Sequence, residues 1–185
     1  MSEQTEYQIV QVDAASVDLV KPLWGELLVH HQEAAVQLAG LGEPLTLDQS
    51  WPIRRAQYLD WFARRAGRMF AATLDGAPMA YCYVRMGEPS PTWNWGDGAG
   101  VLETLFVSRH ARSNGLGSQL ADLAFEHFRQ AHVRLVTVSV VAGNERAVQL
   151  YRRFGGIDLL QTLAMPVQTN RCPAAESPRG EGPCQ

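Results

Sequence analysis

The sequence is poor in the residues that build disulfide frameworks and metal centres. Its 185 residues include only three cysteines, Cys82, Cys172 and Cys184, and no CxxC, HExxH or His-rich cluster occurs. His30 and His31 are adjacent on an expected helix, where neighbouring side chains diverge and cannot both face one metal. We therefore expect no disulfide scaffold and no bound metal. Cys82 lies in an apolar, strand-like run and is expected to be a buried, inert thiol.

Long apolar runs and an excess of basic charge are also missing. No apolar stretch approaches the ~20 residues needed to cross a bilayer. The opening segment, MSEQTEYQIV, is polar and acidic, unlike a secretory signal. The net charge of -3, without a long basic run, gives no reason to propose a nucleic-acid partner. The composition, 46% hydrophobic and 19% charged, is typical of a soluble globular protein, so we expect cytoplasmic localisation and no membrane partner.

Hydrophobic periodicity predicts a single α/β domain over residues 1–169, followed by a disordered, Pro/Gly/Ser-rich tail over 170–185. The run VRLVTVSVV is nearly continuous and β-branched, which indicates a strand buried on both faces in a parallel pairing. Helices are expected from Ser16 to about His31, from Ser50-Pro52 to Ala66, from Leu116 to about Ala131, and after Asn144. Strands are expected at 6–12, on both sides of the Asp75-Gly76 turn, and at 101–107, 133–141 and 157–167.

The stretch RSNGLGSQL, residues 112–120, places two glycines between an expected strand and an expected helix. Gly115 and Gly117 would let main-chain N–H groups approach a ligand, and the following helix would present its positive N-terminus to a phosphate. A tight turn without a ligand is an equally good interpretation of this stretch alone. A Walker loop is excluded because Ser118-Gln119 follow the last glycine, and a dinucleotide fingerprint is weak because its third glycine is replaced by Leu120.

The spacing R-x-x-G-x-G resembles the acetyl-CoA-binding signature of the GNAT superfamily of N-acetyltransferases. Two further segments resemble that family in the right order: ETLFVSRHARSNGLG, its central strand and pyrophosphate loop, and NERAVQLYRRFGG, its N-x-x-A-x-x-L-Y-x-x-x-G segment. The sequence departs from the family at Ser113, where glycine is common, and at Gly156, where an aromatic residue is usual. The resemblance implies a GNAT-like α/β fold, with a mixed central sheet of six to seven strands flanked by about four helices.

The same resemblance implies how acetyl-CoA would bind. A splayed pair of strands would expose main-chain groups at Phe106 and Val107 to the pantetheine arm. Arg112 would add charge to the phosphate loop, and Asn144 would bond the arm, although a helix N-cap is an equally good role for Asn144. The implied acetyl-CoA site comprises Leu105, Phe106, Val107, Arg112, Ser113, Asn114, Gly115, Leu116, Gly117, Ser118, Asn144 and Tyr151.

Two residues are candidates for the chemistry. Glu103 is expected on one face of its strand with Val101, Leu105 and Val107, where burial would raise its pKa and suit it to act as the general base. The alternative is a strand-end carboxylate paired with an arginine. Tyr151 matches the family's general acid beside the thioester sulfur, and its alternative is a core tyrosine bonded to the main chain.

Together these features predict direct transfer of an acetyl group from acetyl-CoA to a primary amine of a small molecule or peptide. A non-catalytic acyl-CoA-binding regulatory module of the same fold, and a donor with a longer acyl chain, stay open, as does a monomer or a homodimer. The acceptor is expected to bind around residues 24–58 and near the Trp93–Trp95 loop. Carboxylates and aromatic residues there, Trp24, Glu26, Glu33, Glu43, Asp48 and Trp51, would suit a cationic amine.

Overall fold

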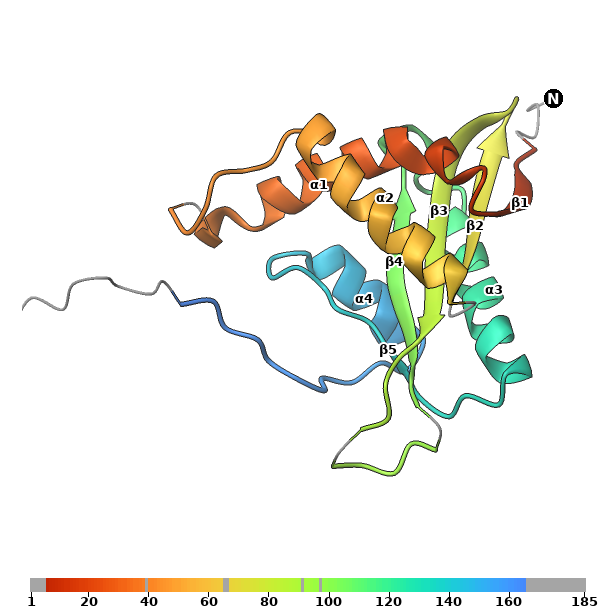
Figure 1. Cartoon of the computed structure of the whole chain (residues 1–185), viewed down its shortest axis with the longest axis vertical. Helices are drawn as coiled ribbons and strands as arrows, with labels where there is room; N and C mark the ends of the chain where they lie inside the picture. Colours follow the sequence, from red (N-terminus) through yellow and green to blue (C-terminus); the bar gives the residue numbers. More distant parts are fainter. Residues whose placement is uncertain (1–5, 39, 65–66, 91, 97, 166–185) are drawn as a thin grey trace, which may run out of the picture.

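A computed structural model describes residues 6–38, 40–64, 67–90, 92–96 and 98–165 as one mixed sheet with helices on both faces (Figure 1). The five described strands lie in the order β1 (Gln8–Val12), β2 (Gly67–Leu74), β3 (Ala77–Met86), β4 (Gly100–Val107) and β5 (Val136–Thr137). The pairs β1–β2, β2–β3 and β3–β4 are antiparallel, whereas β4 and β5 are parallel. The predicted hairpin at Asp75-Gly76 is confirmed, since both residues have positive φ between β2 and β3.

Two helices cover each face of the sheet. The helices α1 (Lys21–Ala34) and α2 (Leu47–Ala63) pack on one face, where Leu23, Trp51 and Tyr58 are buried against Tyr81 and Phe106. The helix α3 (Leu116–Gln130) packs on the other face through Leu120, Ala124 and Phe128. The helix α4 (Glu145–Arg153) lies beside α3, since the rings of Phe125 and Phe154 are 5.2 Å apart. Short 3-10 turns occupy Val17–Val20, Val36–Leu38 and Arg109–Ala111.

The start of α2 differs from the prediction because of a capping box. Thr46 accepts a hydrogen bond from the N–H of Gln49, and the Gln49 side chain accepts one from the N–H of Thr46. The helix therefore begins at Leu47, before Ser50, and Pro52 lies inside it. The first helix also begins later than predicted, because Ser16 precedes the 3-10 turn and its side chain makes no capping bond.

The C-terminal part of the sheet is shorter than predicted. Only Val136–Thr137 of the run 133–141 is a strand, and the segment 157–165 is not a strand and is exposed, with no described strand beside it. The described sheet thus has five strands instead of six to seven. Residues 166–185, which include the predicted tail, lie outside the described residues. None of the helices in the described segments combines the length and apolarity that a bilayer-spanning helix requires.

Candidate active site

The centre of the fold is a gap that opens where β4 and β5 diverge. The two strands pair only at Gly100 with Val136 and at Val101 with Thr137. Beyond that point residues 102–107 and 138–141 line opposite walls of a cavity of about 460 Å³. The cavity also reaches α1, α2, the loop before α3, and α4. The predicted splayed strand pair is therefore present, and its short pairing explains why β5 is only two residues long.

The loop before α3 leaves main-chain donors facing this cavity. Ser113 and Gly115 both adopt left-handed conformations, with φ of 71° and 76°, and both line the cavity. The first main-chain bond of α3 is donated by Gln119 to Gly115, and no side chain caps the helix. The N–H groups of residues 116–118 are therefore free for a ligand. By contrast, side chains cap α2 and α4.

Different constraints favour glycine at positions 115 and 117 of the loop. Gly115 has positive φ, which side chains disfavour. Gly117 is helical, and a Cβ there would lie 3.6 Å from Val107 Cγ2, an ordinary contact. Packing within the chain therefore does not require glycine at 117, whereas close approach of a ligand would.

Arg112 and Asn114 flank the loop in different ways. The Nε of Arg112 donates to the carbonyl of Val107 at 3.2 Å, and its guanidinium lies 5.9 Å from the Phe106 ring centroid. Burial, followed by the charges of Arg146 and Arg109, lowers the pKa of Arg112. Asn114 is the one residue of the predicted acetyl-CoA site that does not line the cavity. Its side-chain amide donates instead to the Tyr7 hydroxyl at 3.0 Å, which ties the loop to the N-terminal segment.

Asn144 takes the helix-cap role that was one of its two interpretations. Its Oδ1 accepts from the N–H of Ala147 at 3.2 Å, at the start of α4. The residue also lines the cavity. Because the cap uses only the carbonyl oxygen, the side-chain NH₂ group is still available to a ligand.

Simple alternation predicted that Glu103 faces the same side of the sheet as Leu105 and Val107, and this prediction is wrong. Thr104 pairs with Tyr83 and Leu102 pairs with Val84, so Glu103 has no partner on β3. This β-bulge turns its carboxylate toward α2, whereas Leu105 and Val107 pack on the α3 side. Residue spacing alone cannot reveal a bulge, because the extra residue reverses the alternation within a strand that otherwise looks regular.

The bulge places the Glu103 carboxylate between two arginines. Oε1 lies 3.2 Å from Nη1 of Arg54, and Oε2 lies 3.0 Å from Nε of Arg85. The side chain is 19% exposed and lines the cavity. The two ion pairs offset the cost of placing a charge in this half-buried position. The arginine pairing foreseen as the alternative is thus present, and it leaves the carboxylate at the cavity wall.

Tyr151 packs on the α3 side of the core and lines the same cavity. Burial, and then the nearby Cys82 thiol, raise the pKa of its hydroxyl well above the usual value for tyrosine. The main-chain hydrogen bond expected of a purely structural tyrosine is absent among its described contacts. The hydroxyl is thus a protonated group whose polar partner could come from a ligand.

Several lining residues were not predicted from the sequence: His30, His31, Arg54, Arg146 and residues 138–141. No motif marks them, because α1, α2, α4 and the segment after β5, which are distant from one another in sequence, meet at the cavity. Of the two tryptophans predicted near the acceptor, Trp24 lines the cavity and Trp51 does not. Both are buried, and their indole N–H groups donate to Ser50 and Asp18 respectively. Among the described residues no group of three metal-ligating side chains occurs.

Comparison with known proteins assigns the sequence of this chain to a family. The profile of the Acetyltransferase (GNAT) family matches residues 36–156. No curated protein sequence matches the chain at a significant level. The matched segment contains the bulged strand, the loop before α3 and the whole of α4, which all line the cavity, whereas the lining residues of α1 precede it.

Solved structures share the fold at low sequence identity. A GCN5-related N-acetyltransferase from Ralstonia eutropha JMP134 is 23% identical, with a TM-score of 0.62 over 88% of this chain and 99% of that one. A predicted acetyltransferase from Clostridium acetobutylicum, solved with acetyl-CoA, is 13% identical, with a TM-score of 0.68 over 86% and 96%. The aminoglycoside N-acetyltransferase AAC(6')-Iy, solved with CoA, is 13% identical, with a TM-score of 0.67 over 91% and 99%.

Proposed function

Because the chain belongs to the GNAT family of acetyltransferases, we propose that it moves the acetyl group of acetyl-CoA to a primary amine of a small molecule or peptide. The transfer is direct, within a ternary complex. One observation carries the proposal: the uncapped N-terminus of α3 opens into a cavity that continues along β4 to Glu103 and Tyr151. A phosphate site and a proton donor and acceptor therefore share one space.

Acetyl-CoA would enter with its pyrophosphate at the loop before α3. The N–H groups of residues 116–118 would bind the phosphate oxygens, and Arg112 would add positive charge. The pantetheine arm would run between the diverging strands, along the main chain of Phe106 and Val107. The Asn144 NH₂ group lies on the opposite wall of the same cavity and would bond the arm from that side.

The chemistry then needs a neutral amine and a protonated leaving group. The amine nitrogen attacks the thioester carbonyl, a C–N bond forms and the C–S bond breaks. Glu103 accepts the proton that the amine loses, through a water molecule, and Tyr151 gives its proton to the departing sulfur. The position of Tyr151 in the cavity lining supports this role, and its raised pKa shows only that the hydroxyl carries a proton at neutral pH.

A covalent acetyl-cysteine route is disfavoured by the state of Cys82. Burial raises the pKa of its thiol to about 12, and Sγ lies 3.7 Å from the carbonyl of Leu120. A thiol in this state is a poor nucleophile at neutral pH.

The test is a pair of measurements on the full chain. Calorimetry should detect CoA binding, and mass spectrometry should detect acetylated product when acetyl-CoA and a panel of amines are supplied. Binding without product from any amine would favour the non-catalytic regulatory module, and absence of both would overturn the proposal.

A further inference from the structure

The cavity has two chemically different ends. One end is formed by the loop before α3 and by α4, and it suits phosphates. The other end lies beneath α1 and α2, where the polar lining side chains include His30, His31, Arg54 and Glu103. Glu103 is the one carboxylate among the described residues that line the cavity. This second end is the part of the cavity left for an acceptor.

Arg54 is held rigidly at this end. Its guanidinium carbon lies 4.5 Å from the ring centroid of Trp24 and 5.5 Å from that of Tyr58. Among the described residues, only Nη1 donates a hydrogen bond, to Glu103. The remaining N–H groups of the guanidinium have no partner there, and the side chain is 20% exposed. A preorganised guanidinium with spare donors is a good site for a carboxylate.

The balance of charge at this end is positive. Glu103 forms ion pairs with both Arg54 and Arg85, so its single negative charge faces two positive charges. The acidic residues of α1 are engaged elsewhere: Glu26 accepts from Ser108, and Glu33 pairs with Arg109. A substrate with several positive charges would therefore meet repulsion here and find no free carboxylate, contrary to the cationic acceptor suggested by the sequence.

We propose that the acceptor is a small amine that carries a carboxylate beside its amino group, as an α-amino acid does, and that Arg54 binds this carboxylate. The inference rests on the proposed acetyl transfer. An α-amino acid bears both groups on one carbon, so its carboxylate can reach Arg54 while its amine lies next to Glu103. His30 and His31 line the same wall and supply further hydrogen-bonding groups. The apolar side chains of Trp24 and Leu27 face the remainder of the acceptor.

Matched pairs of ligands test this without requiring turnover. Binding of N-acetyl-leucine and N-acetyl-leucinamide to the CoA-saturated protein is measured by NMR titration, and the comparison is repeated with the glycine, phenylalanine and glutamate pairs. The acid should bind at least about tenfold more tightly than its amide in at least one pair, as expected for a charge-assisted hydrogen bond. Arg54→Gln should abolish that preference, whereas Arg54→Lys should retain part of it.

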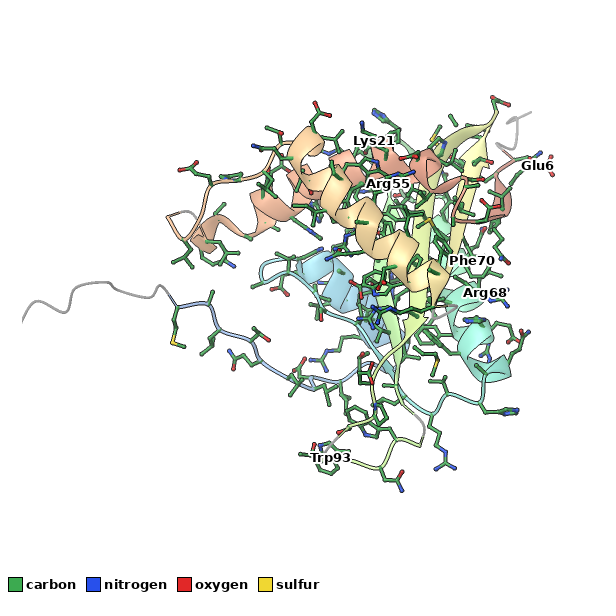
Figure 2. All side chains as sticks on the ribbon, in the orientation of Figure 1. Glu6, Lys21, Arg55, Arg68, Phe70 and Trp93 are labelled. Carbon is green, nitrogen blue, oxygen red and sulfur yellow. The ribbon has the colours of Figure 1, made fainter. Side chains whose placement is uncertain are left out.

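Arg55→Gln is the matched control, because Arg55 is the next residue of α2 but pairs with Asp18 and does not line the cavity (Figure 2 labels it near Lys21). This variant should keep the full preference. A merely structural role of Arg54 would weaken acid and amide equally, and this result would overturn the proposal. Equal binding of acid and amide by the wild type in every pair would also overturn it.

Kinetics separate this inference from the proposed function. With acetyl-CoA, kcat/KM should be higher for leucine than for leucinamide, isopentylamine, spermidine or kanamycin. Faster acetylation of spermidine or kanamycin would overturn the carboxylate proposal and leave acetyl transfer intact. Failure of CoA to bind at all would instead remove the proposed function.

Discussion

Oε1 of Glu103 lies 3.2 Å from Nη1 of Arg54, although 49 residues separate them in sequence. The contact joins β4 to α2 in the lining of the cavity, so the proposed base and the proposed acceptor-binding residue form one unit. A change at either residue therefore affects both proton transfer and acceptor binding, and the two effects must be separated by the measurement chosen.

Replacement of Glu103 by glutamine tests the base. Glu103→Gln keeps the shape of the side chain but removes the proton acceptor, so kcat/KM should fall by roughly 10²–10⁴. The rate should recover partly as the pH rises, because solvent then deprotonates more of the amine. Glu33→Gln, which removes an exposed ion pair with Arg109, is the control and should leave the rate unchanged. Full activity of Glu103→Gln at pH 7 would show that another group takes the proton.

The phosphate loop is tested at Gly117. Gly117→Glu places a negative charge where the pyrophosphate is proposed to lie, so CoA affinity measured by calorimetry should fall at least about tenfold. The fold should survive, because a Cβ at 117 makes only an ordinary contact with Val107 and acidic residues stabilise the first turn of a helix. Gly42→Glu, at a glycine with no atom near its would-be Cβ, should not change CoA affinity. Unchanged affinity in Gly117→Glu would overturn the phosphate site.

Tyr151 carries the prediction on pH. The protonated hydroxyl is the form that can donate, and burial raises its pKa well above 10. Raising the pH from 7 to 10 should therefore not remove this donor, and the wild-type kcat should show no fall from its ionisation while circular dichroism shows the protein folded. Tyr151→Phe should lower kcat by roughly 10² and leave CoA affinity unchanged.

The control for Tyr151→Phe is Tyr83→Phe. Tyr83 is buried, lies outside the cavity lining, and its hydroxyl has no hydrogen-bond partner among the described residues. Its loss should not lower kcat. If Tyr151→Phe and Tyr83→Phe behave alike, Tyr151 is not the proton donor.

Cys82 provides a test of direct transfer. In a variant with Cys172→Ser and Cys184→Ser, Cys82 is the one remaining thiol. Because burial raises its pKa to about 12, it should not react with a thiol reagent in the folded protein at pH 8, and it should react fully in denaturant. This variant should acetylate the acceptor at the wild-type rate without forming an acetylated protein. An acetyl-cysteine trapped by mass spectrometry would contradict direct transfer.

The sequence predicted those parts of the site that local patterns determine. The loop before α3, the cap at Asn144 and the hairpin at Asp75-Gly76 each depend on a few neighbouring residues, and each is found where expected. The orientation of Glu103 could not be predicted, because the bulge arises from pairing with β3. Arg54 belongs to no sequence motif, and its proposed role depends on a contact between α2 and β4, which are distant in sequence.

The errors at the C-terminal end have a related cause. The run 133–141 has strand composition, yet only Val136–Thr137 pairs, because β4 and β5 diverge to form the cavity. The segment 157–165 has similar composition but no described neighbour to pair with. A strand requires a partner, and composition alone does not supply one. Trp93, labelled in Figure 2, is 65% exposed, and neither Trp93 nor Trp95 lines the cavity where the sequence analysis placed them near the acceptor.

The last prediction concerns the junction from which the two strands diverge. Gly100 begins β4, pairs with Val136, and donates its N–H to the carbonyl of Leu135 at 2.8 Å. A Cβ at 100 would lie 2.5 Å from Cε1 of Phe128, a buried ring of α3. Gly100→Ala should therefore lower the free energy of unfolding by about 1–3 kcal/mol, the usual cost of overpacking a core, as measured by urea denaturation. Gly42→Ala, with open space around it, is the control and should be close to neutral.

A double-mutant cycle identifies the cause of that loss. Phe128→Leu removes the ring edge that the new methyl group would strike, so Gly100→Ala should cost less in the Phe128→Leu background than in the wild type. Strictly additive effects would show that the strain lies elsewhere. Because Gly100 pairs with Val136 one residue before the last β4–β5 pair, Gly100→Ala should also weaken CoA binding measured well below the melting temperature. Lost stability with unchanged CoA affinity would instead show that the cavity tolerates movement at this junction.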